Sequence, residues 1–198
     1  MQKLVYYSFV PSPIGRLLVT AEGSLLTGLY MSGHKGRPAP QPDWQRADEP
    51  LRAVRRQLED YFTGRRQTFD MPLRMAGTSF QQLVWKALVR IPFGTTITYA
   101  QLAARIGRPG AARAVGHANS RNPISIVVPC HRVIGADGAL AGYAGGLDKK
   151  RWLLDLERTV SAAEYCATID RPASSGDDHS AASTVSRLPS IAARSGRS

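Results

Sequence analysis

The stretch that decides the fold is ISIVVPCHRVI, residues 124–134. Its β-branched residues favour an extended, buried segment, and Pro129 stops that segment from continuing as a regular ladder. We therefore expect Cys130 where a buried strand ends. His131 and Arg132 follow it directly, and two adjacent cations lower a thiol pKa from about 8.5 towards neutrality, which favours the nucleophilic thiolate. The alternative is that Cys130 is a small buried hydrophobic residue.

Before this stretch, the sequence predicts two helices joined by a short turn. The capping-box pattern TYAQ at residues 98–101 begins a helix that ends at Gly107. The turn 108–110 leads to a helix over 111–119, made of small residues around one arginine, Arg113. This is a helix-turn-helix pattern, and its small side chains allow close approach to a DNA groove. An ordinary helical hairpin is the alternative. Few side chains on the second helix can read base edges, which favours binding with little sequence preference.

After this stretch comes a Gly/Ala-rich loop, GADGALAGYAGG at residues 135–146, with Tyr143 as its only aromatic residue. Such a loop can form a flexible wall that admits a flat ligand such as an extruded base, or it can be a merely floppy connection. A last helix is expected over 149–157, with Glu157 at its end.

Residues 1–76 predict a small α/β scaffold domain, 77–158 a DNA-binding and active-site domain, and 159–198 a disordered tail. Hydrophobic patterning within the first two parts predicts strands over 4–9, 16–21, 25–30 and, at an edge, 68–74, and helices over 48–62 and 79–90.

The net charge of +11 over 198 residues permits a polyanionic partner. Residues 158–198 contain five Arg and four acidic residues, so the excess positive charge belongs to the rest of the chain. The two cysteines, Cys130 and Cys166, do not suggest a disulfide framework. No run approaches the ~20 apolar residues of a membrane span. We expect a cytoplasmic monomer that binds no membrane.

The motifs together resemble the O6-alkylguanine-DNA alkyltransferases, also called methylated-DNA–protein-cysteine methyltransferases. The resemblance is carried by PCHRV at residues 129–133, Asn122-Pro123, ARAVG at 112–116 and GYAGG at 142–146. It covers residues 80–157 closely and 1–77 in outline. It implies an α+β fold, with a small ribonuclease-H-like domain followed by a helical domain. It also implies repair of double-stranded DNA containing alkylated bases, by irreversible transfer of a methyl or other alkyl group from guanine O6 to Cys130.

The resemblance implies a role for each matching residue. His131 would act as base through a water, and Glu157 would orient its imidazole. Asn122 would be a hinge between helix and active-site segment, Arg113 a finger in the base stack, and Tyr99 a donor to the purine. Further DNA contacts would come from Ala112, Ala114 and Gly116, and the base pocket from Val133, Tyr143 and Ala144.

Two departures limit what is carried over. Ala144 stands where some family members have serine, so a hydroxyl contact is not assumed there. Some members bind a structural zinc through N-terminal Cys and His, but no cysteine precedes Cys130, so no metal and no cofactor is expected.

Three other functions are alternatives: an alkyl-lesion sensor without transfer activity, a helix-turn-helix regulator, and a thiol hydrolase. A sensor would be expected to lack Cys130, and a regulator to carry base-reading side chains. A hydrolase needs direct contact between thiol and imidazole, which adjacent residues on an extended chain disfavour.

Overall fold

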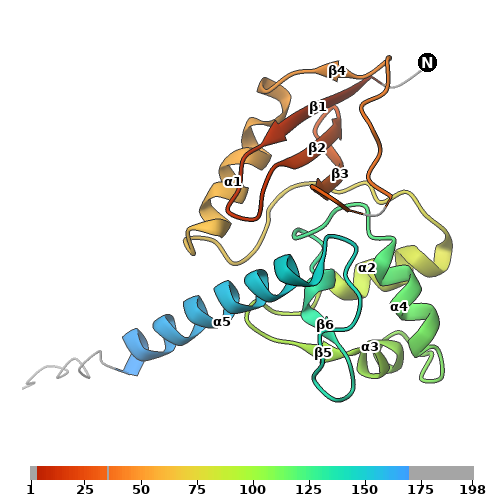
Figure 1. Cartoon of the computed structure of the whole chain (residues 1–198), viewed down its shortest axis with the longest axis vertical. Helices are drawn as coiled ribbons and strands as arrows, with labels where there is room; N and C mark the ends of the chain where they lie inside the picture. Colours follow the sequence, from red (N-terminus) through yellow and green to blue (C-terminus); the bar gives the residue numbers. More distant parts are fainter. Residues whose placement is uncertain (1–3, 35, 170–198) are drawn as a thin grey trace, which may run out of the picture.

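The computed structural model describes residues 4–34 and 36–169, which form an N-terminal sheet with one helix and a C-terminal group of helices (Figure 1). The expected α+β architecture is confirmed. The N-terminal part contains β1 (Val5–Val10), β2 (Leu17–Glu22), β3 (Leu25–Met31), β4 (Gln45–Arg46), η1 (Glu49–Leu51) and α1 (Arg52–Phe62). The C-terminal part contains α2 (Ser79–Val89), β5 (Ile97–Thr98), α3 (Tyr99–Arg105), α4 (Ala112–Ser120), η2 (Cys130–Arg132), β6 (Val133–Ile134) and α5 (Leu147–Ile169).

The sheet has the order β3-β2-β1-β4, and its three long strands match the expected ones to within a residue. Gly23, with φ of +57°, makes the expected turn between β2 and β3. The edge strand expected over 68–74 is wrong, since only Leu73 pairs, in an isolated bridge to Leu26. Pro72 has no N–H to donate, so a continuous ladder cannot form there.

Helix α1 presents Val54, Leu58 and Tyr61 to the core, and all three are buried. Its first turn is the 3₁₀ segment η1, which contains Pro50. The ring of Tyr61 meets that of Phe93, from the C-terminal part, edge to face at 6.0 Å. Thus α1 contacts both halves of the molecule.

The helix-turn-helix expectation is confirmed by α3 and α4, which pack against each other. Thr98 caps α3 by accepting from the N–H of Gln101, and the Gln101 side chain accepts in return from the N–H of Thr98. Gly107, with φ of +69°, ends the first helix. This geometry leaves one side of α4 facing outward.

The segment before Cys130 corrects one expectation. Residues 124–128 are buried, but they form a tight turn rather than a strand, because Ile126 has a φ of +74°. The Asn122 side chain closes the turn, as its Oδ1 accepts from Ile124 N at 3.0 Å and its Nδ2 donates to Val128 O at 2.8 Å. The turn also pairs with Leu29 of β3, which fixes it against the N-terminal sheet.

Helix α5 continues to Ile169, so its expected end at Glu157 and the expected start of the tail at residue 159 are wrong. The residues after Glu157 include Ala and Glu, and no Gly or Pro stops the helix before Pro172. Val160 packs on Gly64 and Ser161 on Gly94. Cys166 is exposed on this helix, and residues 170–198 of the expected tail lie outside the described range.

Candidate active site

Cys130 begins the 3₁₀ segment η2 and is almost completely buried, with 4 % of its surface exposed. Its N–H donates to Val128 O at 2.8 Å, and its carbonyl accepts from Asn119 Nδ2, on α4, at 3.2 Å. The Asn122-closed turn and α4 therefore determine the position of the cysteine backbone. Asn119 was not predicted as a site residue, because nothing in the sequence distinguishes it from other helical polar residues.

The expected cause of thiol activation is wrong. Burial raises the pKa of the Cys130 thiol, and the Asn122 side chain, the Lys150 ammonium and the Tyr143 hydroxyl oppose that rise. His131 does not supply a charge, because burial lowers the pKa of its imidazole. The guanidinium of Arg132 is bound to Glu157. The resting thiol is therefore protonated at neutral pH and needs a base.

His131 and Glu157 meet as expected, with 2.9 Å between Nε2 and Oε1, and both side chains are buried. Burial alone raises the pKa of the Glu157 carboxyl, but His131 and Arg132 outweigh it and hold that pKa at about 2. Glu157 is thus a carboxylate, which can only accept a hydrogen bond. The proton of neutral His131 therefore lies on Nε2, leaving Nδ1 as the basic nitrogen. Within the described residues, Nδ1 has no hydrogen-bond partner.

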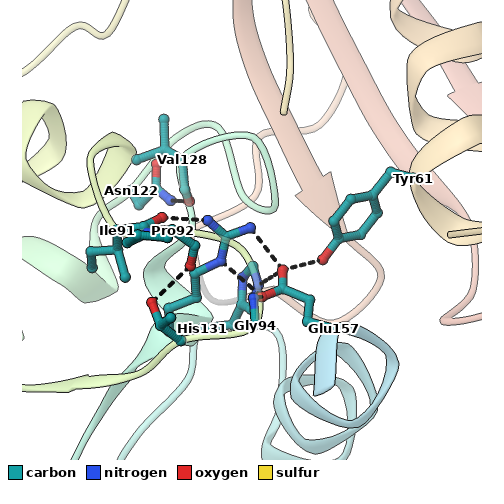
Figure 2. A network of polar contacts seen from close by, with 10 residues as sticks. Tyr61, Ile91, Pro92, Gly94, Asn122, Val128, His131 and Glu157 are labelled. Atoms are coloured by element: carbon teal, nitrogen blue, oxygen red, sulfur yellow. Dashed lines mark hydrogen bonds and ion pairs between the residues drawn. The ribbon is translucent and has the colours of Figure 1, made fainter. Parts of the chain in front are cut away.

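Five donors surround the Glu157 carboxylate, most of which Figure 2 shows. Oε1 accepts from Tyr61 Oη at 2.7 Å, from His131 Nε2 and from Arg132 Nη2, the last two at 2.9 Å. Oε2 accepts from Arg132 Nε at 2.9 Å and from the N–H of Gly94 at 3.1 Å. These donors outweigh the cost of burying the charge. Tyr61 was not expected at the site, since it lies 96 residues away in the chain.

Lys150 is a further residue near the thiol that the sequence did not predict. Its side chain is fully buried, and Nζ donates to Val133 O at 2.6 Å and to Ala141 O at 2.9 Å. Burial lowers its pKa to about 8, although Cys130 opposes that shift. One signal was available, because Lys150, Leu153 and Glu157 have the i, i+3, i+7 spacing of a single helix face.

A cavity of about 790 Å³ opens beside α4. Six of the predicted residues line it: Tyr99, Ala112, Arg113, Gly116, Tyr143 and Ala144. His117, Ser120 and Arg121, which were not predicted, extend the same face of α4. Cys130 does not line this cavity, but Tyr143 does. The Tyr143 hydroxyl is buried without a hydrogen-bond partner among the described residues, yet it is near enough to lower the pKa of the Cys130 thiol. Tyr143 therefore links the cavity to the thiol.

Two of the residues predicted to contact DNA or the base lie apart from the cavity wall. Ala114 is exposed on α4 but does not line the cavity, while Val133 is fully buried and its carbonyl binds Lys150. Tyr99 is half-buried, and its hydroxyl donates to Ala141 O at 3.4 Å. Burial raises the pKa of Tyr99, so it remains a neutral donor.

Within residues 4–34 and 36–169, no three His, Cys, Asp or Glu side chains come together as a metal site, and none of the helices combines the length and the hydropathy that a membrane span requires.

The sequence and structure were compared with known proteins. Residues 5–75 match the ribonuclease-like domain, and residues 79–159 the DNA binding domain, of 6-O-methylguanine DNA methyltransferase. A methylated-DNA–protein-cysteine methyltransferase of Methanosarcina barkeri is 50 % identical over 77 % of this chain and 97 % of its own length. That of Mycobacterium bovis is 47 % identical over 81 % of this chain and 97 % of its own.

Among solved structures, the Mycobacterium tuberculosis protein OGT in complex with DNA is 48 % identical. The likeness covers 78 % of this chain and 94 % of that one, with a TM-score of 0.73. Both domain matches, the near-complete coverage of the relatives and the shared fold agree with the motifs around Cys130. The chain belongs to the 6-O-methylguanine DNA methyltransferase family.

Proposed function

We propose that this protein repairs double-stranded DNA by transferring an alkyl group from O6 of guanine to Sγ of Cys130, once per molecule. The observation that carries the proposal is the His131–Glu157 pair directly after Cys130, together with Tyr143, which lines the cavity on α4 and acts on the Cys130 thiol. O4-alkylated thymine is a second candidate substrate. We further propose that the protein acts in the cytoplasm as a monomer.

DNA binding is assigned to the outward face of α4. Its small residues allow close approach to the duplex, and Arg113 lines the cavity without an ion pair in the described part of the chain. Arg113 would fill the space that an extruded base leaves in the stack, while the base enters the cavity beside Tyr99 and Tyr143. Arg121, at the same cavity, suits a phosphate.

The chemical step begins with a proton. Because the resting Cys130 thiol is protonated, its proton passes through a water to His131 Nδ1, the unpartnered basic nitrogen. Glu157 stabilises the imidazolium through Nε2. The buried Lys150 ammonium stabilises the sulfur anion.

The sulfur then displaces the alkyl carbon. The S–C bond forms as the C–O6 bond breaks, and the electron pair of that bond remains with the guanine. Tyr99, a neutral phenol, donates a hydrogen bond to the purine and so improves the leaving group. The product is a thioether, and no group in the described site is placed to remove the alkyl group. The protein is therefore consumed in the reaction.

The test is mass spectrometry after mixing the protein with an excess of duplex containing O6-methylguanine. The expected result is one methyl group per protein, on the peptide with Cys130. Cys166→Ala is the matched control and should react fully, because Cys166 is exposed on α5, more than two turns beyond Glu157. Cys130→Ala should gain no methyl group. Repeated turnover, or a methyl group on Cys166, would refute the proposal.

The same experiment separates the alternative functions. A lesion sensor or a helix-turn-helix regulator would bind the duplex without any gain of mass, and a sensor would prefer alkylated over unmodified duplex. Cys130, held beside a histidine and a carboxylate, favours transfer over binding alone.

A further inference from the structure

We propose that Tyr61, from the N-terminal domain, is a positioning residue of the active site, whose hydroxyl holds Glu157 and through it sets the orientation and proton affinity of His131. This inference rests on the proposed role of His131 as the base. It makes the N-terminal domain a part of the proton relay rather than only a scaffold.

The geometry links the two domains through one oxygen atom. Tyr61 Oη lies 2.7 Å from Glu157 Oε1, and the same oxygen accepts from His131 Nε2 at 2.9 Å (Figure 2). Tyr61 is fully buried and Glu157 is 1 % exposed, so water does not replace this bond. Tyr61 comes from α1, Glu157 from α5 and His131 from η2. Three elements therefore meet at Oε1.

The direction of the hydrogen bond follows from the charges. Burial, and then the neighbouring Glu157, raise the pKa of Tyr61 well above its ordinary value, so the phenol keeps its proton. The Glu157 carboxyl, with a pKa of about 2, stays ionised. Tyr61 can then only donate, and a donor to an anionic acceptor makes a stronger bond than one between neutral groups.

The ring of Tyr61 cannot swing away from this position. It packs against Phe69 at a centroid distance of 5.4 Å, Phe62 at 5.5 Å and Phe93 at 6.0 Å. Phe93 belongs to the C-terminal domain, and the other two to the N-terminal domain. The hydroxyl is thus held rigidly, as a group that orients a catalytic pair must be.

Tyr61 lowers the pKa of His131 because both residues donate to the same oxygen of Glu157. The phenol takes up part of the negative charge that would otherwise stabilise an imidazolium. The other groups that act on the His131 charge are Arg132 beside it and Lys150 on α5, both cations. Together with burial, these groups keep His131 neutral and able to accept the Cys130 proton.

If Tyr61 had a purely structural role, it would only fill the core. Tyr61→Phe distinguishes the positioning role from this structural role, because it keeps the ring and removes only the hydroxyl. Four donors would still bind the carboxylate, so the variant should fold. Tyr30→Phe is the matched control, since Tyr30 lies in the same domain and burial likewise raises its pKa, without Glu157 among the causes.

The first measurement is the His131 pKa, by nuclear magnetic resonance of protein carrying labelled histidine, with His131→Gln used for assignment. Tyr61→Phe should raise this pKa by about one unit, because the carboxylate then attracts the imidazolium more strongly. Tyr30→Phe should leave it unchanged. An unchanged His131 pKa in Tyr61→Phe would overturn the proposal. This measurement does not depend on whether the protein transfers a methyl group.

The second measurement is the single-turnover rate of methyl transfer against pH. In Tyr61→Phe the acidic limb of the pH–rate profile should move to higher pH by the same amount as the His131 pKa. The plateau should fall by less than the roughly 100-fold that a general base contributes, because His131 is retained. If wild type transfers methyl and Tyr61→Phe keeps an unchanged profile, the positioning role alone fails. If wild type transfers none, the proposed function fails.

Discussion

A single buried ammonium, that of Lys150, is the charge that favours the Cys130 thiolate. The sequence pointed instead to His131 and Arg132, because they are adjacent to the cysteine. In the fold, burial keeps His131 neutral, and Glu157 binds Arg132. Adjacency along the chain therefore does not measure electrostatic influence, which depends on where each charge lies and on what neutralises it.

Replacing Lys150 should weaken the nucleophile. Lys150→Met removes the charge with little loss of volume, so the thiol pKa should rise by about one unit. At neutral pH the rate of alkylation should then fall roughly tenfold. The rate of iodoacetamide labelling is measured at pH 7, below the Lys150 pKa of about 8, so that the ammonium is charged, in a Cys166→Ala background. Lys149→Met is the matched control, because Lys149 Nζ binds Ser32 O and Gly145 O and does not act on the thiol. Equal behaviour of the two variants would exclude the Coulombic role.

At the scale of single residues, the sequence predicted the ionisable relay but not the residues that stabilise and orient it. Cys130, His131 and Glu157 were predicted because a family motif names them. Lys150 and Tyr61 were missed because each acts through a contact made only in the folded chain. No pattern in the sequence places the lysine beside the thiol, and the tyrosine belongs to a helix of the other domain.

Among the secondary-structure elements, α4 carries the predicted DNA contacts on one face. Arg113, Gly116 and Ser120 recur at helical spacing along the cavity. The helix itself was predictable from its turn and its small residues, and so was its outward face. Its role depends on α3, which supplies Tyr99 to the same cavity.

Arg113→Ala should therefore affect duplex and free substrates differently. Without the side chain that fills the stack, methyl transfer from duplex should slow by about tenfold or more, since extruding a base costs a few kcal/mol. Reaction with free O6-methylguanine should change little, because no stack is opened. Single-turnover kinetics on both substrates test this. Arg56→Ala removes the positive charge of an exposed side chain on α1 and so controls for net charge. Equal losses on duplex and free base would remove the role of Arg113.

Two elements could not be predicted from local patterns. The segment 124–128 has the composition of a strand, yet Ile126 adopts a positive φ that isoleucine rarely takes. The Asn122 side chain supplies the hydrogen bonds that make this turn possible, in place of a strand partner. The end of α5 could not be predicted for a different reason, because the apolar periodicity of the sequence stops before the helix does.

For the whole molecule, Glu157 is the point at which both domains meet. Its donors come from α1, from the loop before β5 and from η2, and the carboxylate itself is on α5. Leu29 of β3 adds a second junction by pairing with the turn at Ile124. One part of the docking of the domains is therefore tied to the ionisation of a single carboxyl group.

Acid should weaken this docking in a defined interval. The folded pKa of Glu157, about 2, is lower than the ordinary value of about 4.3. The carboxylate thus contributes on the order of 3 kcal/mol above about pH 5, and the contribution disappears as the pH falls towards 2. His131, whose folded pKa is also lowered, acts in the same direction below about pH 6.5. Between pH 7 and pH 3.5, Glu157 alone should account for a loss of about 1 kcal/mol.

Urea denaturation at both pH values measures this loss. Glu157→Gln should be less stable than wild type at pH 7 by about 3–5 kcal/mol, because Arg132 is left as a buried charge without its partner. Since glutamine does not titrate, the variant should lose about 1 kcal/mol less than wild type between pH 7 and pH 3.5. Asp155→Asn, at an exposed carboxylate on the same helix, should retain the full dependence. If Glu157→Gln and wild type lose the same free energy over this interval, the low pKa of Glu157 does not stabilise the fold, and the domains are held together by packing and by contacts such as the Leu29 junction.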